Sequence, residues 1–300
     1  MPVKQSYEAL LHAEITKSIE NLMLLARVIT DNFSAGQHVS NGLGSGVQFN
    51  QYRNYEVGDD LRMLDWKLFA RSNRFYIKQS EIESNTTIKF IIDNSKSMEY
   101  AEGALSKLDY AKIIIAALAK LCEQQNDAFG LYAVNDQHLL DLLPRHHKQQ
   151  YLKLLNVLVN LNATGKWPSS TSEVTNLHNS SQKELIFVIT DFYEYANELT
   201  KTIHQLKTTK NEVVVLHLMH KNEMEFSYKS NITFEDLETG NKIKVNTKAY
   251  KEEYISKIQQ NIKSNEAVLL SKNISYHLFR LDEPLENTLQ LFLKKRRSIH

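Results

Sequence analysis

The sequence predicts an α/β protein built on a doubly wound, mostly parallel sheet with helices on both faces, preceded by an N-terminal helix and a short β-rich extension. Two observations lead to this prediction. Beyond about residue 85, short β-rich apolar runs alternate with segments of helical spacing, which is typical of helices packed on a parallel sheet. Before that point, one helical pattern is followed by a segment dense in aromatic and charged residues. We therefore expect an N-terminal region over residues 1–85 and an α/β domain over residues 86–300.

The composition excludes several classes of protein. Of 300 residues, 42% are hydrophobic and only nine are Gly and four Pro, which rules out collagen, low-complexity sequence and wholesale disorder. The net charge of +1 gives no global field for binding nucleic acid. The single cysteine, Cys122, cannot form an internal disulfide, and no apolar run reaches membrane-spanning length. We expect a soluble, cytoplasmic protein with no membrane span and no nucleic-acid partner.

The N-terminal region is expected to begin with an amphipathic helix. Between residue 7 and about residue 32, apolar residues recur in steps of three and four, which places them on one helical stripe. These residues are Leu11, Ile15, Ile19, Leu22, Ala26 and Ile29. A Gly-rich turn at residues 42–46 follows, and short strands and loops are expected from there to about residue 84.

The α/β domain is expected to contain five main strands with helices between them. The strand candidates are residues 86–92, 128–134, 185–190, 213–218 and 275–281. Helical patterns mark residues 108–122, 151–161, 199–206, 250–262 and 285–295. Ser106 and Asp109 match a capping box at the start of the first of these helices. Residues 138–143 are expected to pair as an antiparallel edge strand, and residues 226–248 to form a β-hairpin insertion.

A cluster of oxygen-bearing side chains is expected at one edge of this sheet. The first strand runs into Asp93, Ser95 and Ser97, a D-x-S-x-S string, and the third strand ends at Asp191. Open α/β sheets bind ligands at the carboxyl ends of their strands, and Mg²⁺ accepts oxygen ligands in octahedral geometry. The four side chains therefore predict a divalent-cation site. The alternative is that Asp93 and Ser95 only cap the next helix.

The D-x-S-x-S string resembles the metal-ion-dependent adhesion site of the von Willebrand factor A fold. A longer signature upstream, R-x-Y-x-x-G-D-D-x-R-x-x-D-W, resembles that of the bacterial domain-of-unknown-function family fifty-eight, whose members place it before an A-type domain. Its residues here are Arg53, Tyr55, Gly58, Asp59, Asp60, Arg62, Asp65 and Trp66, followed by Arg71. Asp236, Glu238, Thr239 and Gly240 resemble the late D-x-E-T-G element of the same family.

This resemblance implies a non-enzymatic protein-binding or adaptor protein with a chaperone-like role in the assembly or maturation of protein complexes. Its implied partners are a protein ligand and a MoxR-type AAA+ ATPase, and its implied cofactor is Mg²⁺ or Mn²⁺. Ser95 and Ser97 would bind the ion directly, while Asp93 and Asp191 would act chiefly through water. A carboxylate from the partner would complete the shell of the ion.

The chain departs from the family pattern at one position of the expected metal site. Trp167 stands where the family has a threonine that resembles the third direct ligand, and an indole cannot coordinate Mg²⁺. Thr164 or a residue of the 169–171 segment could take its place if the loop is rebuilt. Otherwise the resemblance implies a weakened or lost metal site.

Two further alternatives stay open at this point. The mixed charges between Arg53 and Arg71 are expected either to form an ion-pair network that locks the N-terminal region onto the α/β domain, with Trp66 as an anchor, or to form a docking surface. The rival function is a Mg²⁺-dependent phosphoryl-transfer enzyme of the haloacid-dehalogenase type. Such enzymes carry a second Asp two residues after the first, where this chain has Ser95.

Overall fold

The computed structural model describes residues 14–35, 49–55, 64–80, 87–170, 177, 183–228 and 231–297. The chain divides into two compact units. We call residues 38–85 the small unit, and residues 1–37 together with 86–300 the α/β unit. The N-terminal helix therefore belongs to the α/β unit, although the sequence analysis grouped it with the extension at residues 1–85.

The α/β unit is built on a six-stranded, mostly parallel sheet. Its strands are β3 (Thr87–Asp93), β4 (Ala128–Val134), β5 (Leu139–Arg145), β6 (Glu184–Thr190), β7 (Asn211–Met219) and β10 (Ser275–Arg280). They lie in the order β10-β7-β6-β3-β4-β5, and only the edge pair β4-β5 is antiparallel. The predicted fold class and the predicted antiparallel edge are confirmed.

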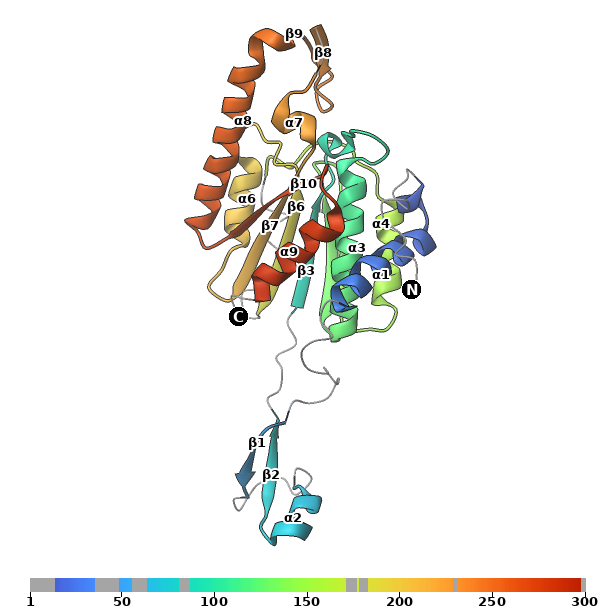
Figure 1. Ribbon diagram of the computed structural model, residues 1–300, viewed down its shortest axis with the longest axis vertical. Coiled ribbons are helices and arrows are strands. Elements are labelled where there is room, and N and C mark those ends of the chain that lie inside the picture. Colours follow the sequence, from blue (N-terminus) through green and yellow to red (C-terminus); the bar gives the residue numbers. More distant parts are fainter. Residues whose placement is uncertain are drawn as a thin grey trace. The chain divides into compact units, whose positions relative to one another are not determined.

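Helices cover both faces of the sheet (Figure 1). One face carries α1 (Ile19–Ala35), α3 (Lys107–Gln125), α4 (Gln150–Asn160) and α9 (Leu285–Arg297). The other face carries α6 (Glu198–Leu206) and α8 (Thr247–Leu270). Short helices among the described residues are η2 (Ile15–Lys17), η4 (Lys96–Glu99) and α7 (Lys221–Glu225).

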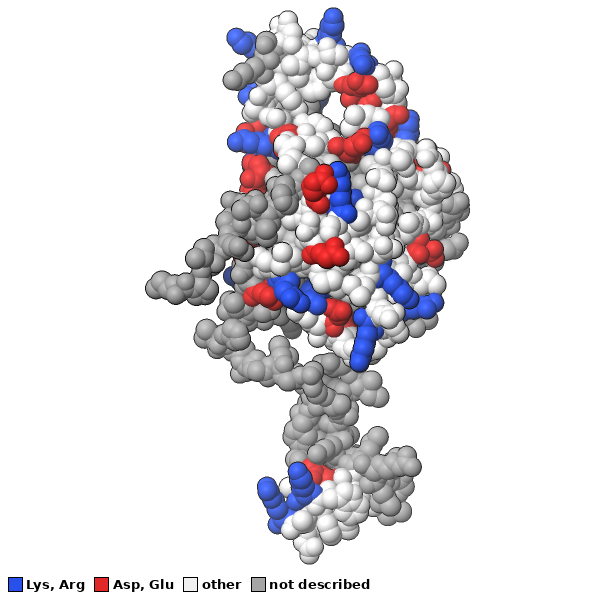
Figure 2. All heavy atoms as spheres, turned by 90° about the vertical axis from the view of Figure 1, so that its right-hand side faces the viewer, with Lys and Arg blue, Asp and Glu red and all other residues white. Residues whose placement is uncertain are grey.

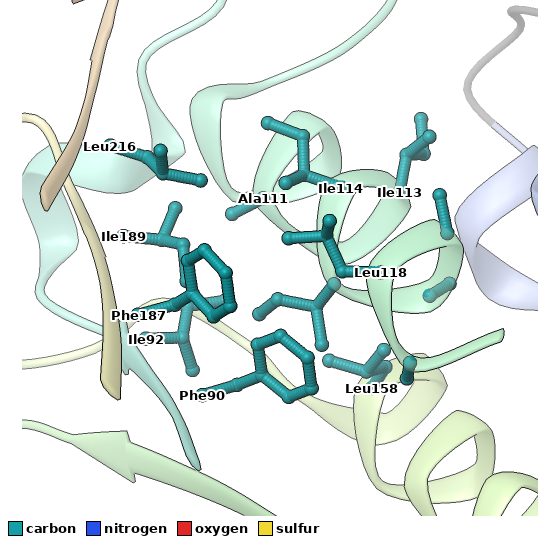
Figure 3. Close-up of a cluster of buried hydrophobic side chains, with 14 of the residues drawn as sticks. Phe90, Ile92, Ala111, Ile113, Ile114, Leu118, Leu158, Phe187, Ile189 and Leu216 are labelled. Carbon is teal, nitrogen blue, oxygen red and sulfur yellow. The ribbon is translucent and has the colours of Figure 1, made fainter. Parts of the chain in front are cut away.

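Alternation along the central strands divides the core into two layers. In β3, Phe90 and Ile92 belong to the cluster under α3, whereas Ile91 between them belongs to the cluster on the opposite face. Figure 3 shows the first cluster, in which Phe90 and Phe187 of the neighbouring strand stack with ring centroids 5.6 Å apart. Because both faces are buried, residues 90–92 of β3 read in the sequence as an apolar run.

The N-terminal helix starts later than its apolar spacing predicted. Ser18 has an extended backbone and separates η2 from α1, so the predicted helix is interrupted at Ser18 and α1 begins at Ile19. Residues 7–13 of the predicted helix lie outside the described residues. Leu22, Leu25 and Ile29 are buried in the cluster shared with α3, which explains why this helix is part of the α/β unit.

The small unit contains a strand pair and a short helix. Strand β1 (Phe49–Asn54) pairs antiparallel with β2 (Tyr76–Ser80), and α2 (Trp66–Ser72) lies between them in the sequence. The rings of Phe69 and Phe75 stack with centroids 4.4 Å apart. The short strands predicted before residue 84 are confirmed, whereas the Gly-rich turn at residues 42–46 lies outside the described residues.

A β-hairpin follows α7, as the turn residues predicted. Strands β8 (Asn231–Glu235) and β9 (Lys242–Asn246) pair antiparallel and lead into α8. The Asp236 carboxylate organises the turn, because its Oδ1 accepts hydrogen bonds from the backbone N–H groups of Glu238 (2.9 Å) and Thr239 (3.2 Å).

Two further features concern the distribution of charge on the surface and the apolar character of the helices. Lys and Arg are interspersed with Asp and Glu on the face seen in Figure 2, where the described residues form no large patch of one sign. Across the described ranges, no helix combines the length and the apolar character needed to cross a bilayer.

Candidate functional site

The structure brings the predicted Asp and Ser residues together at the carboxyl edge of β3 and β6. These strands are parallel neighbours, so Asp93 at the end of one and Asp191 after the other lie at the same edge of the sheet. The Ser97 hydroxyl donates to Asp191 Oδ1 at 3.2 Å, and the hydroxyl oxygens of Ser95 and Ser97 lie 3.0 Å apart. All four side chains are buried.

Asp93 is the innermost carboxylate of this cluster. Its Oδ1 accepts the backbone N–H of Ser95 at 3.0 Å, and its Oδ2 accepts the hydroxyl of Thr190 at 2.7 Å. Burial and the neighbouring charge of Asp191 raise the pKa of Asp93 to about 6. The Ser95 hydroxyl makes no capping hydrogen bond to η4, so the helix-cap interpretation does not account for this serine.

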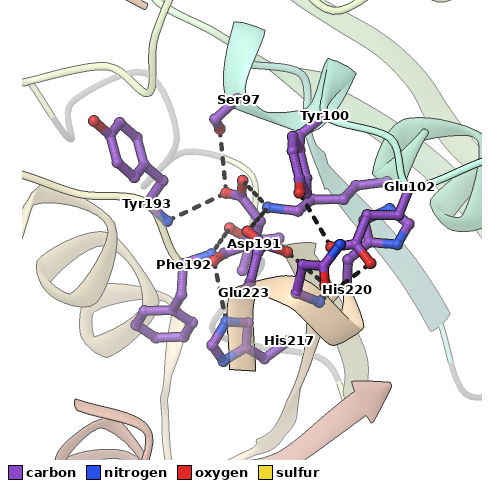
Figure 4. Close-up of polar contacts among 12 residues, drawn as sticks. Ser97, Tyr100, Glu102, Asp191, Phe192, Tyr193, His217, His220 and Glu223 are labelled. Carbon is purple, nitrogen blue, oxygen red and sulfur yellow. Dashed lines mark hydrogen bonds and ion pairs between the residues drawn. The ribbon is translucent and has the colours of Figure 1, made fainter. Parts of the chain in front are cut away.

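A buried lysine that the sequence analysis did not single out holds the second carboxylate. Lys107 Nζ lies 2.9 Å from Asp191 Oδ2 and 2.6 Å from Glu223 Oε1. Figure 4 labels both of these carboxylate residues, Asp191 and Glu223. Burial acts to raise the pKa of Asp191, but the Lys107 ammonium holds it below its usual range. Burial raises the pKa of Glu223 despite the same ammonium. The sequence could have indicated Lys107, because a lysine in the first turn of a helix opposes the helix dipole and needs a specific acidic partner.

Two buried histidines complete the surroundings of the site. The ring nitrogens of His217 lie 2.6 Å from the Tyr276 hydroxyl and 3.0 Å from the carbonyl oxygen of Asp191. Burial lowers the pKa of both His217 and His220 to about 4, so both rings are neutral near pH 7. Within the described residues, no three His, Cys, Asp or Glu side chains are grouped so that they could hold a metal ion by themselves. The cluster at β3 and β6 is instead rich in hydroxyl oxygens.

The loop at residues 164–167 places Thr164, and not Trp167, beside the D-x-S-x-S segment. The backbone N–H of Thr164 donates to the Asn94 carbonyl at 2.9 Å, and the backbone N–H of Lys96 donates to the Gly165 carbonyl at 2.9 Å. The Thr164 hydroxyl accepts from the Asn135 amide at 2.9 Å. Trp167 is buried in the apolar cluster on the α6 face of the sheet.

A glycine is required in this loop. Gly165 has a φ of +64°, and a Cβ at this position would clash with the Asp136 carboxylate. The same carboxylate accepts the backbone N–H of Lys166 at 2.9 Å. Of the other predicted substitutes for the missing threonine, Ser169 and Ser170 lie further along the loop, and Thr171 lies outside the described residues.

The signature cluster of the small unit is described only in part. Asp65 caps α2, with its Oδ1 accepting the backbone N–H groups of Lys67 and Leu68 at 3.0 Å each. The backbone N–H of Tyr55 donates to the Phe75 carbonyl at 3.0 Å. Trp66, the predicted anchor, is 59% exposed and meets the ring of Phe69 edge-on.

The remaining members of this cluster leave its role open. Arg71 lies exposed near the end of α2. The residues Gly58, Asp59, Asp60 and Arg62 and the side chain of Arg53 lie outside the described part. The choice between an ion-pair network and a docking surface therefore stays a prediction.

The sheet order, the single antiparallel edge strand and the D-x-S-x-S segment at the end of a central strand define a von Willebrand factor A-like α/β domain. The family described as "Protein of unknown function DUF58" matches residues 51–264, more than half of the chain. The chain belongs to this family.

Curated relatives and solved structures are similar to most of this chain. Uncharacterized proteins of Mycobacterium tuberculosis and Mycobacterium bovis are each 19% identical over 230 residues, which cover 76% of this chain and 72% of theirs. The hypothetical protein BatB of Bacteroides thetaiotaomicron is 17% identical with a TM-score of 0.45, over 71% of this chain and 99% of that one. An aerotolerance-related membrane protein of Bacteroides fragilis is 17% identical with a TM-score of 0.46, over 72% and 100%. The phosphoryl-transfer alternative gains no support from these matches.

Proposed function

We propose that the α/β unit is a non-enzymatic binding module that holds Mg²⁺ or Mn²⁺ between β3 and β6 and uses it to bind another protein. The observation that carries this proposal is the spacing of three oxygens. Ser95 Oγ and Ser97 Oγ lie 3.0 Å apart, and Ser97 Oγ lies 3.2 Å from Asp191 Oδ1. Adjacent ligands of an octahedral Mg²⁺ ion with bonds of about 2.1 Å lie about 3 Å apart. The two serine hydroxyls therefore have the spacing of adjacent direct ligands, with the Asp191 carboxylate beside Ser97.

The charges around the site favour a cation. Asp191 interacts electrostatically with both Asp93 and Glu223, and one ammonium, that of Lys107, pairs with Asp191 and Glu223. Lys107 occupies Oδ2 of Asp191 and leaves Oδ1 toward the serines. A buried carboxylate without an opposite charge is costly, and a divalent ion would neutralise the excess. When bound, such an ion would offer an open coordination position to a carboxylate of the protein ligand.

The surroundings of the two serines argue against an enzyme. Nucleophilic catalysis by a hydroxyl needs an adjacent base. Both ring nitrogens of His217, which lies beside Asp191, are occupied by the Tyr276 hydroxyl and a backbone carbonyl. The Ser97 hydroxyl is directed at Asp191 Oδ1, and Lys107 holds the pKa of that carboxyl low, so Asp191 is a weak base.

The partner and the setting rest on the family resemblance and not on the geometry. The resemblance favours a MoxR-type AAA+ ATPase as the partner and a chaperone-like role in assembling or maturing protein complexes. The composition favours the cytoplasm. A binding module that presents a cation to an acidic side chain suits such an adaptor role.

The test of this proposal is titration calorimetry with Mn²⁺. We expect the parent protein to bind, and Ser97→Ala to lower the affinity at least tenfold, about 1.4 kcal/mol, because the ion loses a direct oxygen ligand. Ser271→Ala, which removes an exposed hydroxyl after α8, is the matched control and should bind as the parent does. Equal affinity of parent and Ser97→Ala, with unchanged thermal melts, would contradict the proposal.

The same titration decides between the two loop residues. Thr164→Ala should weaken Mn²⁺ binding, because Thr164 lies beside the D-x-S-x-S segment. Trp167→Thr should lower stability without tightening binding, because Trp167 is buried in an apolar cluster. Tighter binding by Trp167→Thr would instead support the alignment that the sequence alone suggested.

A further inference from the structure

A groove lined mostly by apolar side chains lies between the β8-β9 hairpin and the start of α8, two elements that Figure 1 shows close together. We call it the hairpin groove. Its volume is about 470 Å³, within the range of about 300 to 1,000 Å³ that is typical of ligand-binding clefts. Its apolar lining consists of Phe226, Phe234, Ile243, Val245, Tyr250 and Tyr254.

The inner side of the hairpin groove is a packed aromatic cluster. Phe226 is buried, and the centroid of its ring lies 4.4 Å from that of Tyr254 and 5.7 Å from that of Phe234. Phe226 has a φ of +48°, which is unfavourable for a bulky side chain, so the packing of its ring holds it in place. The groove is therefore formed in advance, and a ligand that enters it pays little to order its walls.

The outer side of the hairpin groove exposes large apolar side chains to solvent. Ile243 is 64% exposed and Tyr250 is 54% exposed, and both line the groove. Val245 lies two residues after Ile243 in β9, so both side chains belong to the same face of the hairpin. Exposed apolar side chains and tyrosines around a concave surface are typical of a protein-interaction site.

The segments that form the hairpin groove carry an excess of lysines. Residues 242–257, which comprise β9 and the first turns of α8, contain five lysines and two glutamates, a net charge of +3 in a chain whose total is +1. At the groove, Lys257 pairs with Glu253 at 2.6 Å. Lys244 also lines the groove and is exposed, and it makes no ion pair within the described part of the chain. Carboxylates on a ligand would complement these lysines.

We propose that the hairpin groove is a docking site for an acidic, amphipathic segment of a partner protein, whose apolar side chains enter the groove while its carboxylates meet the lysines of β9 and α8. A groove receives side chains, whereas membrane binding relies on apolar side chains that insert into lipid. Two copies of this chain meeting groove to groove would bring like charges together. The inference goes beyond the proposed function, because this surface needs no cation.

The experiment measures the fluorescence anisotropy of a labelled synthetic peptide, an amphipathic helix with Leu on one face and Glu on the other. The buffer contains EDTA, which removes divalent cations, so that the carboxylates of the peptide do not report on the candidate cation site. We expect the parent protein to bind this peptide at least about tenfold more tightly than a peptide with Lys in place of Glu. Equal affinities for the two peptides, or no binding of the acidic peptide, would overturn the inference and leave the cation site standing.

Two variants with matched controls locate the binding. Ile243→Ser should weaken binding about tenfold, because an apolar contact is lost, whereas Leu143→Ser removes a similarly exposed side chain from edge strand β5 and should bind as the parent does. Lys244→Glu should weaken binding about fivefold at low salt and less at about 1 M salt, where charges are screened. Lys153→Glu makes the same charge change on α4 and should have no effect. Parent-like affinity in Ile243→Ser or in Lys244→Glu would overturn the inference.

Two further measurements test the other occupants of the hairpin groove. We expect the parent to stay in solution when vesicles of anionic phospholipid are sedimented, and to sediment as a monomer in the ultracentrifuge. Vesicle binding that Ile243→Ser abolishes would assign the groove to a membrane surface and overturn the inference. A dimer that Ile243→Ser dissociates would assign the groove to a second copy of the chain, with the same consequence.

Discussion

Lys107 decides how much of the candidate site is free to bind a ligand. It occupies the first turn of α3, where the helix dipole disfavours a cation, and it is buried. Its two carboxylate contacts offset both costs. The Lys107 ammonium neutralises the Oδ2 side of the Asp191 carboxylate. The Oδ1 side, together with the hydroxyls of Ser95 and Ser97, is the side left to bind a ligand.

We expect Lys107→Met to destabilise the α/β unit by about 3 to 5 kcal/mol, because it leaves Asp191 and Glu223 buried without their cation. Methionine keeps the apolar stem, so the loss reports the charge and not the volume. Urea denaturation measures the change. Lys257→Met, which breaks an exposed ion pair with Glu253, should leave the unfolding curve unchanged. Equal stability of Lys107→Met and the parent would show that the buried ion pair contributes nothing net.

At the scale of elements, signals close together in the sequence predicted most of the fold. The capping box of Ser106 and Asp109 is present with both of its hydrogen bonds, and β4 has the bounds that its apolar run predicted. The adjacency of Asp93 and Asp191 followed from strand ends meeting at one edge. The contacts of Lys107 did not follow, because they join residues 84 and 116 positions apart. No local pattern reports such contacts.

Asp65, the N-cap of α2 in the small unit, gives a prediction for the stability of one element. Asp65→Ala should destabilise this unit by about 1 kcal/mol, because α2 loses the carboxylate that accepts two backbone N–H groups. Asp65→Asn keeps an equivalent cap and removes the charge, so the difference between the two variants separates the contribution of the cap from that of the charge. Denaturation followed by Trp66 fluorescence in a Trp167→Phe background reports this unit. An equal loss in both variants would favour the ion-pair network that the sequence suggested.

For the whole molecule, the division into two units has a direct spectroscopic consequence. The chain contains two tryptophans, and each unit holds one of them. Trp66 starts α2 of the small unit and is 59% exposed, whereas Trp167 is buried in the core of the α/β unit. Each indole therefore reports the unfolding of its own unit. The α/β unit has two buried clusters, while the small unit consists of residues 38–85, a length at which a single core gives marginal stability.

We expect the two units to unfold at different denaturant concentrations. In Trp66→Phe, the fluorescence of Trp167 should follow the main cooperative transition seen by circular dichroism. In Trp167→Phe, the fluorescence of Trp66 should change at a lower concentration, because the small unit buries less apolar surface. The Trp167→Phe substitution itself weakens the α/β unit, so the comparison is made against the circular dichroism curve of each variant. Coincidence of the fluorescence and dichroism curves in both variants would mean that the chain unfolds as one cooperative body, because two-state unfolding makes all probes agree.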